Sequence, residues 1–248
     1  MKKFAKAGDI KVGVVGYGGA FNMGKSHLSE MVRAKMTPVA VCEIDKSRLE
    51  VAARDFPGIE TYTSVDELLE KSRVNLVTLI TPHNTHAALA KKCLAAGRHV
   101  VSEKPMAITT AECDSMIAVS KRRGVVLSTY HNRHWDSIIL GAMKHLRAGV
   151  VGKVVRVDID MAGWGKPGDW WRSSKSISGG ILYDWGVHLL EYTLQMIQAD
   201  IREVSGYLWS GVWADQTKWK NDTNEDEGFV VVRYAGGAWS TLRISSIE

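Results

Sequence analysis

The stretch Lys11–Gly19, KVGVVGYGG, decides the fold of this chain. Its apolar first half is typical of a buried strand, and its glycines make a tight turn before a helical pattern that reaches about residue 35. A strand, a glycine turn and a helix in this order are what a dinucleotide-binding loop requires, because free N–H groups at a helix start attract a pyrophosphate. The residues predicted to contact a cofactor in this loop are Gly16, Gly18, Gly19, Ala20 and Phe21.

The loop departs from the usual dinucleotide fingerprint in one place. Phe21 stands where a third glycine or alanine is expected, and the segment GGAFNMGKS carries extra residues before a helix that begins near Gly24. A pair of glycines is often only a tight turn, so this loop alone leaves the structural and the cofactor-binding interpretations equally open.

An acidic residue, Glu43, lies at the end of the second apolar run, residues 39–44. A carboxylate there accepts hydrogen bonds from both hydroxyls of an adenosine ribose and repels a 2′-phosphate, which favours NAD over NADP. Two alternatives stay open, because Glu43 is equally placed to be a solvated strand end and Asp45 competes for the ribose.

The first half of the chain alternates short apolar runs with helical patterns. The apolar runs cover residues 11–15, 39–44, 59–62, 74–81, 99–102 and 125–130. Strands that are apolar throughout and alternate with helices predict a parallel sheet covered on both faces. We therefore expect a doubly wound parallel (Rossmann) α/β domain over residues 1–130.

The second half has a different pattern, which predicts an α+β domain over residues 131–248. Its strand-like runs mix polar with apolar residues and cover residues 154–160, 204–211, 229–234 and 238–244. Gly236 and Gly237 separate the last two runs as a hairpin turn would. We expect an open, mostly antiparallel sheet with one long helix, which contains residues 179–191 (GGILYDWGVHLLE), and a solvated acidic loop over residues 221–227.

Composition excludes several classes of protein. The 248 residues carry a net charge of +5 with the basic residues scattered, which predicts no nucleic-acid partner. No run approaches the length of a membrane span, and the N-terminus lacks the apolar segment of a secretory signal, so no membrane partner is expected. Three cysteines without metal-like spacing fit reduced thiols in a cytoplasmic protein.

The long helix carries Asp184 and His188, which lie four residues apart on one helix face, where their side chains can touch. Taken alone, such a pair is either a structural hydrogen bond or a catalytic carboxylate–imidazole pair. His131 and His134 form an HxxH motif, but without a third ligand this motif predicts no metal site.

Several motifs follow one another in a fixed order along the chain. They are TPHNTH at residues 81–86, SEKP at residues 102–105, the pair Asn132-Arg133, and GGxxxDxGxH at residues 179–188. With the glycine loop and the acidic strand end, this order resembles the Gfo/Idh/MocA family (glucose–fructose oxidoreductase and inositol dehydrogenase), from about Lys11 to the end of the chain. The combination of EKP with a later DxGxH is specific, although each piece alone is weak.

The resemblance implies a catalytic set of three residues. Lys104 is expected beside the nicotinamide, where its charge stabilises the developing negative charge on the substrate oxygen. His188 is expected to take the hydroxyl proton, and Asp184 to orient the imidazole. The other residues expected to bind the cofactor are Thr81, Pro82, Asn84, His86 and Glu103. The other residues expected to contact the substrate are Asn132, Arg133, Trp164, Trp171 and Arg172. Helix capping by Asn84 and ordinary packing of the tryptophans remain the alternatives.

The implied function is an NAD-dependent oxidoreductase acting on a secondary alcohol of a sugar, polyol or inositol-like substrate. Two alternatives are a glycoside-cleaving enzyme of the same family that uses NAD catalytically, and a redox-silent sensor that binds NAD and a sugar. The family's habit implies a dimer or tetramer formed through the open sheet face. Members usually continue into further strands and a closing helix, so the second sheet is expected to be incomplete at its C-terminal end.

Overall fold

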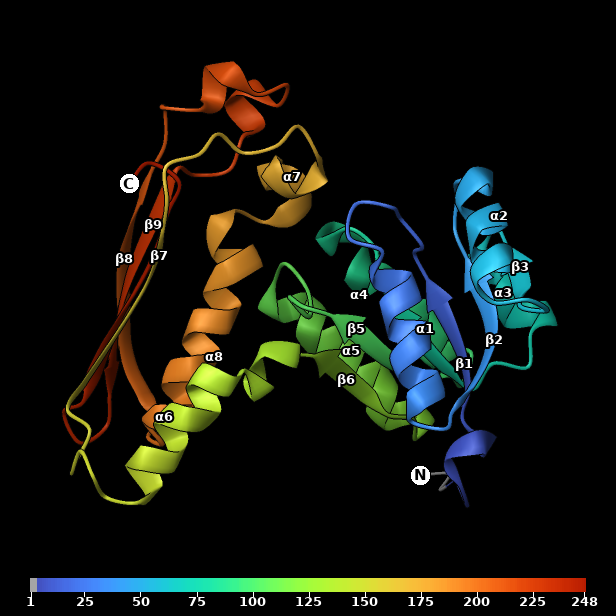
Figure 1. The fold of residues 1–248 in the computed structure, drawn as a ribbon, viewed down its shortest axis with the longest axis horizontal. Coiled ribbons are helices and arrows are strands. Elements are labelled where there is room, and N and C mark those ends of the chain that lie inside the picture. Colours follow the sequence, from blue (N-terminus) through green and yellow to red (C-terminus); the bar gives the residue numbers. More distant parts are fainter. Residues whose placement is uncertain (1–3) are drawn as a thin grey trace. The chain divides into compact units, whose positions relative to one another are not determined.

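The computed structural model describes residues 4–248 and contains two compact units, Met1–Tyr130 and His131–Glu248 (Figure 1). The first unit is called the Rossmann unit below and the second the α+β unit. Within the described residues, no helix is both long enough and apolar enough to cross a membrane.

The Rossmann unit is built on a six-stranded sheet in which every neighbouring pair is parallel, with the order β3-β2-β1-β4-β5-β6. Its strands are β1 (Lys11–Val15), β2 (Thr37–Cys42), β3 (Glu60–Tyr62), β4 (Leu76–Leu79), β5 (His99–Glu103) and β6 (Leu127–Tyr130). The predicted doubly wound parallel sheet is confirmed. Its strand order reverses beside β1, between β1 and β4, which is where open α/β sheets bind ligands.

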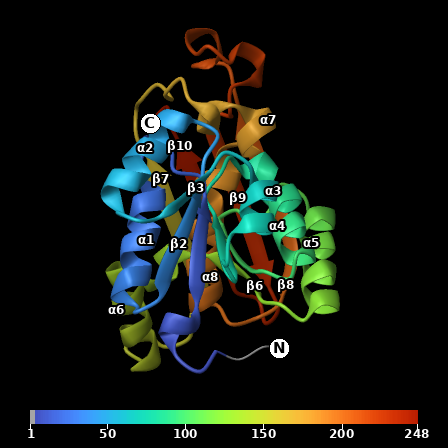
Figure 2. The ribbon, with the colours of Figure 1, turned by 90° about the vertical axis from the view of Figure 1, so that its right-hand side faces the viewer.

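Helices cover both faces of this sheet (Figure 2). They are α1 (Met23–Arg33), α2 (Lys46–Asp55), α3 (Val65–Lys71), α4 (His86–Ala95) and α5 (Thr110–Arg123), with 3₁₀ turns η1 (Ala7–Asp9) and η2 (His83–Thr85). In Figure 2, α1 and α2 lie on one side of the strands and α3, α4 and α5 on the other. Thr109 and Glu112 begin α5 with a reciprocal capping box, in which each side chain bonds the other residue's backbone N–H.

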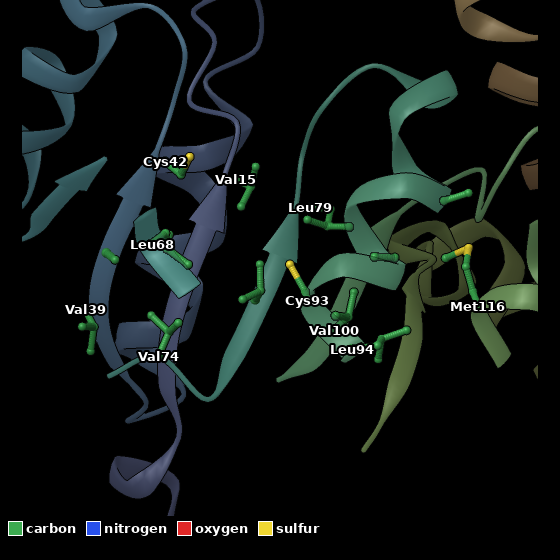
Figure 3. Packing of buried hydrophobic residues seen from close by; sticks show 14 of the residues in the cluster. Val15, Val39, Cys42, Leu68, Val74, Leu79, Cys93, Leu94, Val100 and Met116 are labelled. Atoms are coloured by element: carbon green, nitrogen blue, oxygen red, sulfur yellow. The ribbon is translucent and has the colours of Figure 1, made fainter. Parts of the chain in front are cut away.

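Two apolar cores fill the two faces of the sheet. Val14 belongs to the core with Leu28 of α1 and Leu49 of α2, whereas its neighbour Val15 belongs to the core with α3, α4 and α5. Successive residues of a strand point to opposite faces, so β1 has to be apolar at both positions. Figure 3 shows the second core, in which Leu79 of β4 and Cys93 of α4 lie side by side.

The α+β unit has a four-stranded sheet in the order β7-β10-β9-β8. Its strands are β7 (Arg156–Ala162), β8 (Ile201–Trp209), β9 (Glu227–Tyr234) and β10 (Trp239–Ser245). The β8–β9 and β9–β10 pairs are antiparallel and the β7–β10 pair is parallel, so the sheet is mixed but mostly antiparallel, as predicted. The hairpin between β9 and β10 turns at Gly236 and Gly237, both with positive φ. All nine residues of β8, at the sheet edge, are exposed.

One face of this sheet packs against helix α8 (Figure 1). The helical segments of the unit are η3 (Asn132–Trp135), α6 (Ser137–Arg147), η4 (Trp171–Ser173), α7 (Lys175–Ser178), η5 (Leu182–Gly186), α8 (Val187–Met196), η6 (Ala214–Gln216) and η7 (Lys220–Asp222). Leu189 of α8 and Leu242 and Ile244 of β10 share one apolar core.

The expectation of one long helix in this unit was wrong. Helix α6 spans eleven residues and was missed, because its run Ile138-Ile139-Leu140-Gly141 combines β-branched residues with a glycine and has low helix propensity. Burial of Ile139 and Met143 in the core beside α8 supplies the stabilisation that local propensity does not.

The expectation of a solvated acidic loop was also wrong in its centre. Glu225 is 4% exposed and Asp226 is 1% exposed. The Asp226 carboxylate accepts hydrogen bonds from the backbone N–H groups of Val212 and Trp213. The Glu225 carboxylate accepts a hydrogen bond from the backbone N–H of Ile181 at 3.1 Å and forms an ion pair with Lys175 at 2.6 Å. Buried carboxylates need such partners, and charge alone therefore did not reveal which acidic residues are inside.

Glu225→Gln is expected to destabilise the α+β unit in a pH-dependent way. Burial alone raises the pKa of Glu225, but the Lys175 ammonium and backbone N–H groups outweigh burial and lower the pKa below its usual range. A lowered folded-state pKa contributes stability above the unfolded-state pKa, which is lost as pH falls through the folded-state pKa. The loss on substitution should be about 1–3 kcal/mol at pH 7 and should shrink below about pH 4.

Urea unfolding followed by tryptophan fluorescence measures this effect, because all nine tryptophans lie in the α+β unit. The matched control is Glu203→Gln, which removes an exposed ion pair with Arg233 and should cost at most about 0.5 kcal/mol. A loss for Glu225→Gln that does not change between pH 7 and pH 3.5 contradicts the role assigned to the carboxylate charge.

Candidate active site

The backbone of the glycine loop packs closely against the residue that follows a neighbouring strand. Gly16 has φ +102°, and a Cβ atom built there would lie 2.2 Å from the carbonyl oxygen of Ile80, just after β4. Such a contact is impossible for any residue with a side chain, so only glycine lets β1 turn beside β4. The structure gives Gly16 this packing role, and its contact with a cofactor stays a prediction.

Helix α1 approaches the same loop through a residue that the sequence reasoning did not assign. A Cβ atom at Gly24 would lie 2.8 Å from the carbonyl oxygen of Gly16 and 2.6 Å from the Tyr17 ring. Close packing of the helix on the strand is the task of the third glycine in a dinucleotide fingerprint. The longer loop moves that glycine from the expected position, Phe21, to Gly24.

The loop between these glycines has room for an anion. Residues 18–21 are exposed, and a methyl group built at Gly18 meets no described atom within 4 Å. Asn22, which precedes α1, has φ +50° and gives its side-chain oxygen to Arg48 rather than to the first turn of the helix. The N–H groups of that first turn are the ones that bind pyrophosphate in this fold, so the loop fits a dinucleotide.

The two carboxylates that competed for the ribose have different surroundings. Glu43 accepts a 2.7 Å hydrogen bond from the backbone N–H of Tyr17 and so is tied to the glycine loop. Asp45 accepts hydrogen bonds from the backbone and hydroxyl of Ser47 and caps α2, and these bonds hold the pKa of Asp45 below its usual range. This difference favours Glu43 as the ribose ligand.

The TPHNTH segment follows β4 and is held together internally. His86 is fully buried, and its two ring nitrogens lie 2.8 Å from the carbonyl oxygen of Pro105 and 2.9 Å from that of Thr81. His86 thus joins the segments that follow β4 and β5, which suits positioning better than contact with a cofactor. The Thr85 hydroxyl bonds the carbonyl of Pro82, whereas Asn84 is exposed.

The EKP motif follows β5, and its glutamate is anchored from α1. Glu103 bonds the His27 ring at 2.8 Å and accepts a hydrogen bond from the backbone N–H of Lys104 at 3.3 Å. The Tyr130 ring packs edge-on against His27, with ring centroids 4.3 Å apart. Lys104 is 9% exposed. His27 belongs to no motif that the sequence analysis considered, and its partner lies 76 residues away.

In the α+β unit, the helix that carries Asp184 and His188 begins with a π-helical turn, η5. A π-helical turn bonds residue i to i+5, and such turns occur frequently at functional sites. Glu225 supports its start by accepting the N–H of Ile181. The sequence pattern predicted an ordinary α-helix here, because apolar spacing does not distinguish one wider turn.

The structure gives each member of the pair a partner from another segment. The Asp184 carboxylate forms an ion pair with Arg172 at 2.5 Å, and Nδ1 of His188 lies 3.0 Å from Nε2 of His131. His188 is 3% exposed. Direct orientation of His188 by Asp184 stays a prediction, and neither Arg172 nor His131 was expected in these particular contacts.

The other residues predicted to contact substrate fall into two groups. Arg172 lies against the rings of Trp170 and Trp171, at 5.4 and 5.0 Å, and so brings two tryptophans close to Asp184. Trp164 instead packs edge-on against Trp213 and forms a bridge with Ile247 at the end of the sheet.

The two residues of the Asn132-Arg133 pair also have different surroundings. The Arg133 guanidinium lies 4.6 Å from the Trp185 ring and bonds Asp136, whereas Asn132 is exposed. Burial opposes the shift, but hydrogen bonds from Tyr192 and Arg133 lower the pKa of Asp136. Arg133 therefore reaches, from η3, the helical segment that carries Trp185 and Asp184.

The HxxH motif is divided between two partners. His131 contacts His188, whereas His134 bonds Glu191. Across residues 4–248, no group of three or more His, Cys, Asp or Glu side chains is placed to hold a metal ion.

These features define a Rossmann unit with a loop suited to a dinucleotide, joined to an α+β unit that carries a buried histidine and a paired aspartate on one helix. The chain belongs to the Gfo/Idh/MocA oxidoreductase family. The family described as an oxidoreductase family with an NAD-binding Rossmann fold matches residues 10–131, and the GFO/IDH/MocA C-terminal domain matches residues 139–248. Residues 10–131 are thus an NAD-binding domain.

Three relatives show what the chain is similar to. The Bacillus subtilis (strain 168) protein named scyllo-inositol 2-dehydrogenase (NADP(+)) IolW is 30% identical over 79% of this chain and 54% of its own length. The myo-inositol 2-dehydrogenase of Thermotoga maritima is 28% identical over 94% of this chain and 67% of its own length. The crystal structure of GenD2 from gentamicin A biosynthesis, in complex with NAD, has a TM-score of 0.83 at 28% identity, over 96% of this chain and 66% of that chain. The chain spans about half the length of the curated relative IolW, and no more than about two thirds of the other two.

Gly16→Ala is expected to destabilise the Rossmann unit by about 2–4 kcal/mol, because it adds a steric clash to an unfavourable φ. The control is Gly58→Ala, where φ is also positive, at +86°, but no described atom lies within 4 Å of the new methyl group. That control should cost only about 1 kcal/mol. Native-state hydrogen exchange of β1 and β4 amides measures the free energy of unfolding of both variants. Equal losses of stability in Gly16→Ala and Gly58→Ala contradict the role given to the Ile80 carbonyl.

Proposed function

We propose that this chain acts as an NAD-dependent oxidoreductase on a secondary alcohol of a sugar, polyol or inositol-like substrate. The family membership supports the reaction class. Because the chain spans only part of each relative, its activity and substrate are proposals that rest on its own residues.

The observation that carries the proposal is the buried imidazole of His188 in the α+β unit. Its Nδ1 lies 3.0 Å from Nε2 of His131, and the Asp184–Arg172 ion pair lies one turn earlier. An imidazole suits a general base because its unperturbed pKa lies near neutral pH. A buried titratable side chain with polar neighbours is a common feature of active sites.

In the proposed reaction each residue has one task. His188 accepts the hydroxyl proton, Asp184 stabilises the protonated imidazole, and Lys104 stabilises negative charge on the substrate oxygen. NAD, when bound, supplies the acceptor for the hydride. His27 and His86 hold the segments on either side of Lys104 and so position it.

The substrate class is proposed from side chains and from relatives. Trp171 offers a ring face suited to the C–H surface of a sugar, and Arg172 beside it offers donors for hydroxyl groups. Two relatives are named as inositol dehydrogenases, which supports cyclitols as the first compounds to test.

We also propose that the chain forms a dimer or tetramer through the sheet face that α8 leaves uncovered. That face carries alternating charges, including Arg243 between Asp160 and Glu227, which suit a polar self-association. Light scattering tests this proposal, and a mass of one chain at all concentrations contradicts it.

Absorbance of reduced nicotinamide tests the function directly. Purified protein and NAD⁺ are mixed with cyclitols, aldoses, sugar acids and aryl glycosides, and a rise is expected with one of the first three groups. Release of an aglycone without net reduction of NAD⁺ identifies the glycoside-cleaving alternative instead. NAD⁺ binding without turnover of any compound favours the sensor.

His188→Ala is expected to lower turnover by at least about 10²-fold while leaving the Kd for NAD within about twofold, because a general base contributes to chemistry and not to cofactor binding. The matched control is His145→Ala, an exposed histidine on α6, which should change neither quantity. Parallel loss of turnover and NAD affinity in His188→Ala contradicts the assignment.

Glu43→Ala is expected to weaken NAD binding by about 10–100-fold, because charged hydrogen bonds of this kind contribute about 1.5–3 kcal/mol. It should also narrow the preference for NAD over NADP, because the charge that repels a 2′-phosphate is lost. Calorimetric titration with both cofactors measures the change. Asp45→Ala is the control, and a larger effect there than at Glu43 reverses the assignment of the ribose ligand.

A further inference from the structure

We propose that Arg48 of α2 is a positioning residue for NAD: its guanidinium holds the glycine loop in place and keeps the first turn of α1 open to a pyrophosphate. This inference rests on the cofactor-binding part of the proposed function, which the family match over residues 10–131 supports. It concerns side chains of the Rossmann unit alone, and it needs no contact between Arg48 and the cofactor.

The Arg48 side chain reaches the glycine loop from the first turn of α2. Its Nε donates a 2.9 Å hydrogen bond to the carbonyl oxygen of Tyr17, and its Nη2 donates a 3.2 Å hydrogen bond to the side-chain oxygen of Asn22. Tyr17 and Asn22 flank residues 18–21, the exposed part of the loop. One guanidinium therefore ties both ends of this segment to α2, which suits the fixed fork of donors that arginine carries.

Tyr17 gives the loop a rigid base. The residue is 1% exposed, and its hydroxyl donates a 2.8 Å hydrogen bond to Asp55, which also pairs with Lys25 of α1 at 2.7 Å. Burial and the hydrogen bond to Asp55 raise the pKa of Tyr17, so the hydroxyl remains a donor at neutral pH. The backbone N–H of Tyr17 donates to Glu43, so the Arg48 bond to its carbonyl adds a further tie to the second strand–helix unit.

The bond to Asn22 affects the start of α1. An asparagine before a helix normally has an extended backbone, and its side-chain oxygen accepts an N–H group of the first turn. In this structure Asn22 is left-handed, with φ +50° and ψ +33°, and its side-chain oxygen accepts the Arg48 bond instead. Arg48 therefore holds the helix's own cap away from the N–H groups that bind a pyrophosphate.

Gly19 shows how closely the guanidinium approaches the loop. A Cβ atom built at Gly19 would lie 3.2 Å from Nη1 and 3.3 Å from Cζ of Arg48. The lack of a side chain at Gly19 leaves the space that the guanidinium needs beside the backbone. The fit indicates that Arg48 packs on the loop as well as bonding to its two ends.

The first test compares Arg48→Met and Arg48→Lys with the unmodified chain by calorimetric titration with NAD. Both variants should bind NAD about tenfold more weakly, because lysine keeps the charge but cannot reproduce the two directed bonds. Adenosine lacks the pyrophosphate, so its Kd, measured by ligand-observed NMR, should stay within about twofold in both variants. Arg54→Met is the matched control: it removes an exposed charge from the same helix and should leave the Kd for NAD within about twofold.

A rescue variant tests the part played by Asn22. Once Arg48 is lost, the Asn22 side chain is released to cap α1 and to compete with the pyrophosphate. Asn22→Gly added to Arg48→Met removes that cap, and glycine tolerates the left-handed backbone, so NAD affinity should recover by about threefold or more. A general loosening of the fold would not be repaired by a second substitution, and no recovery overturns the proposal.

Amide exchange without cofactor measures the same event directly. Gly24 and Lys25 are the second and third residues of α1, whose N–H groups an N-cap side chain binds. Water-exchange NMR should show both amides exchanging about threefold more slowly in Arg48→Met than in the unmodified chain, because Asn22 then protects one of them and orders the turn. The double variant should return to the unmodified rate, and unchanged rates in Arg48→Met contradict the release of Asn22.

Two further results overturn the proposal. Unmodified NAD affinity in Arg48→Lys shows that charge alone is enough, and equal losses for adenosine and NAD in Arg48→Met show a direct contact with the adenosine half. Backbone amide spectra confirm that each variant is folded. None of these measurements uses turnover, so this inference can fail while an alcohol is oxidised, and it can succeed when no alcohol is oxidised.

Discussion

The close approach of three backbone segments at Gly16 is the constraint on which the Rossmann unit depends. The turn after β1 lies against the Ile80 carbonyl on one side and against Gly24 of α1 on the other, and neither contact leaves space for a side chain. This crossing fixes where α1 begins, and hence where its free N–H groups point. It also brings the backbone of Tyr17 to the Glu43 carboxylate, so that the pyrophosphate loop and the ribose ligand are parts of one hydrogen-bonded structure. The extra residues between Gly19 and Gly24 lengthen the loop without disturbing this crossing.

The fold could be predicted from sequence where a whole element is buried on both faces, and not where burial depends on a few contacts with distant segments. Strands such as β1 and β4 are apolar on both faces, which leaves a parallel sheet between two layers of helices as the consistent arrangement. Helix α6 was missed because Ile138, Ile139 and Gly141 disfavour a helix locally, and only packing against α8 stabilises one. Glu225 and Asp226 were expected in solvent because acidic residues usually are, and their hydrogen-bond partners come from segments more than a dozen residues away.

In the candidate site, the residues in short motifs could be predicted from sequence, and the distant residues that contact them could not. Short motifs indicated Lys104, Asp184, His188 and Glu43, because the chemistry of each residue type limits what it can do at that place in the fold. The residues that hold them were not indicated: His27 reaches Glu103 across 76 positions, and His131 reaches His188 across 57. Such pairs depend on the tertiary fold alone, and a single sequence carries no local signal for them. Gly24 is an exception, since a search that allowed a longer loop would have found it.

The charges around His188 bear on how a base of this kind stays available. A carboxylate bonded directly to Nδ1 stabilises the imidazolium and raises the imidazole pKa, and a ring that is already protonated cannot accept a hydroxyl proton. In this structure the Asp184 carboxylate is paired with Arg172, and Asp136 is paired with Arg133 and Tyr192, so each nearby negative charge has a partner.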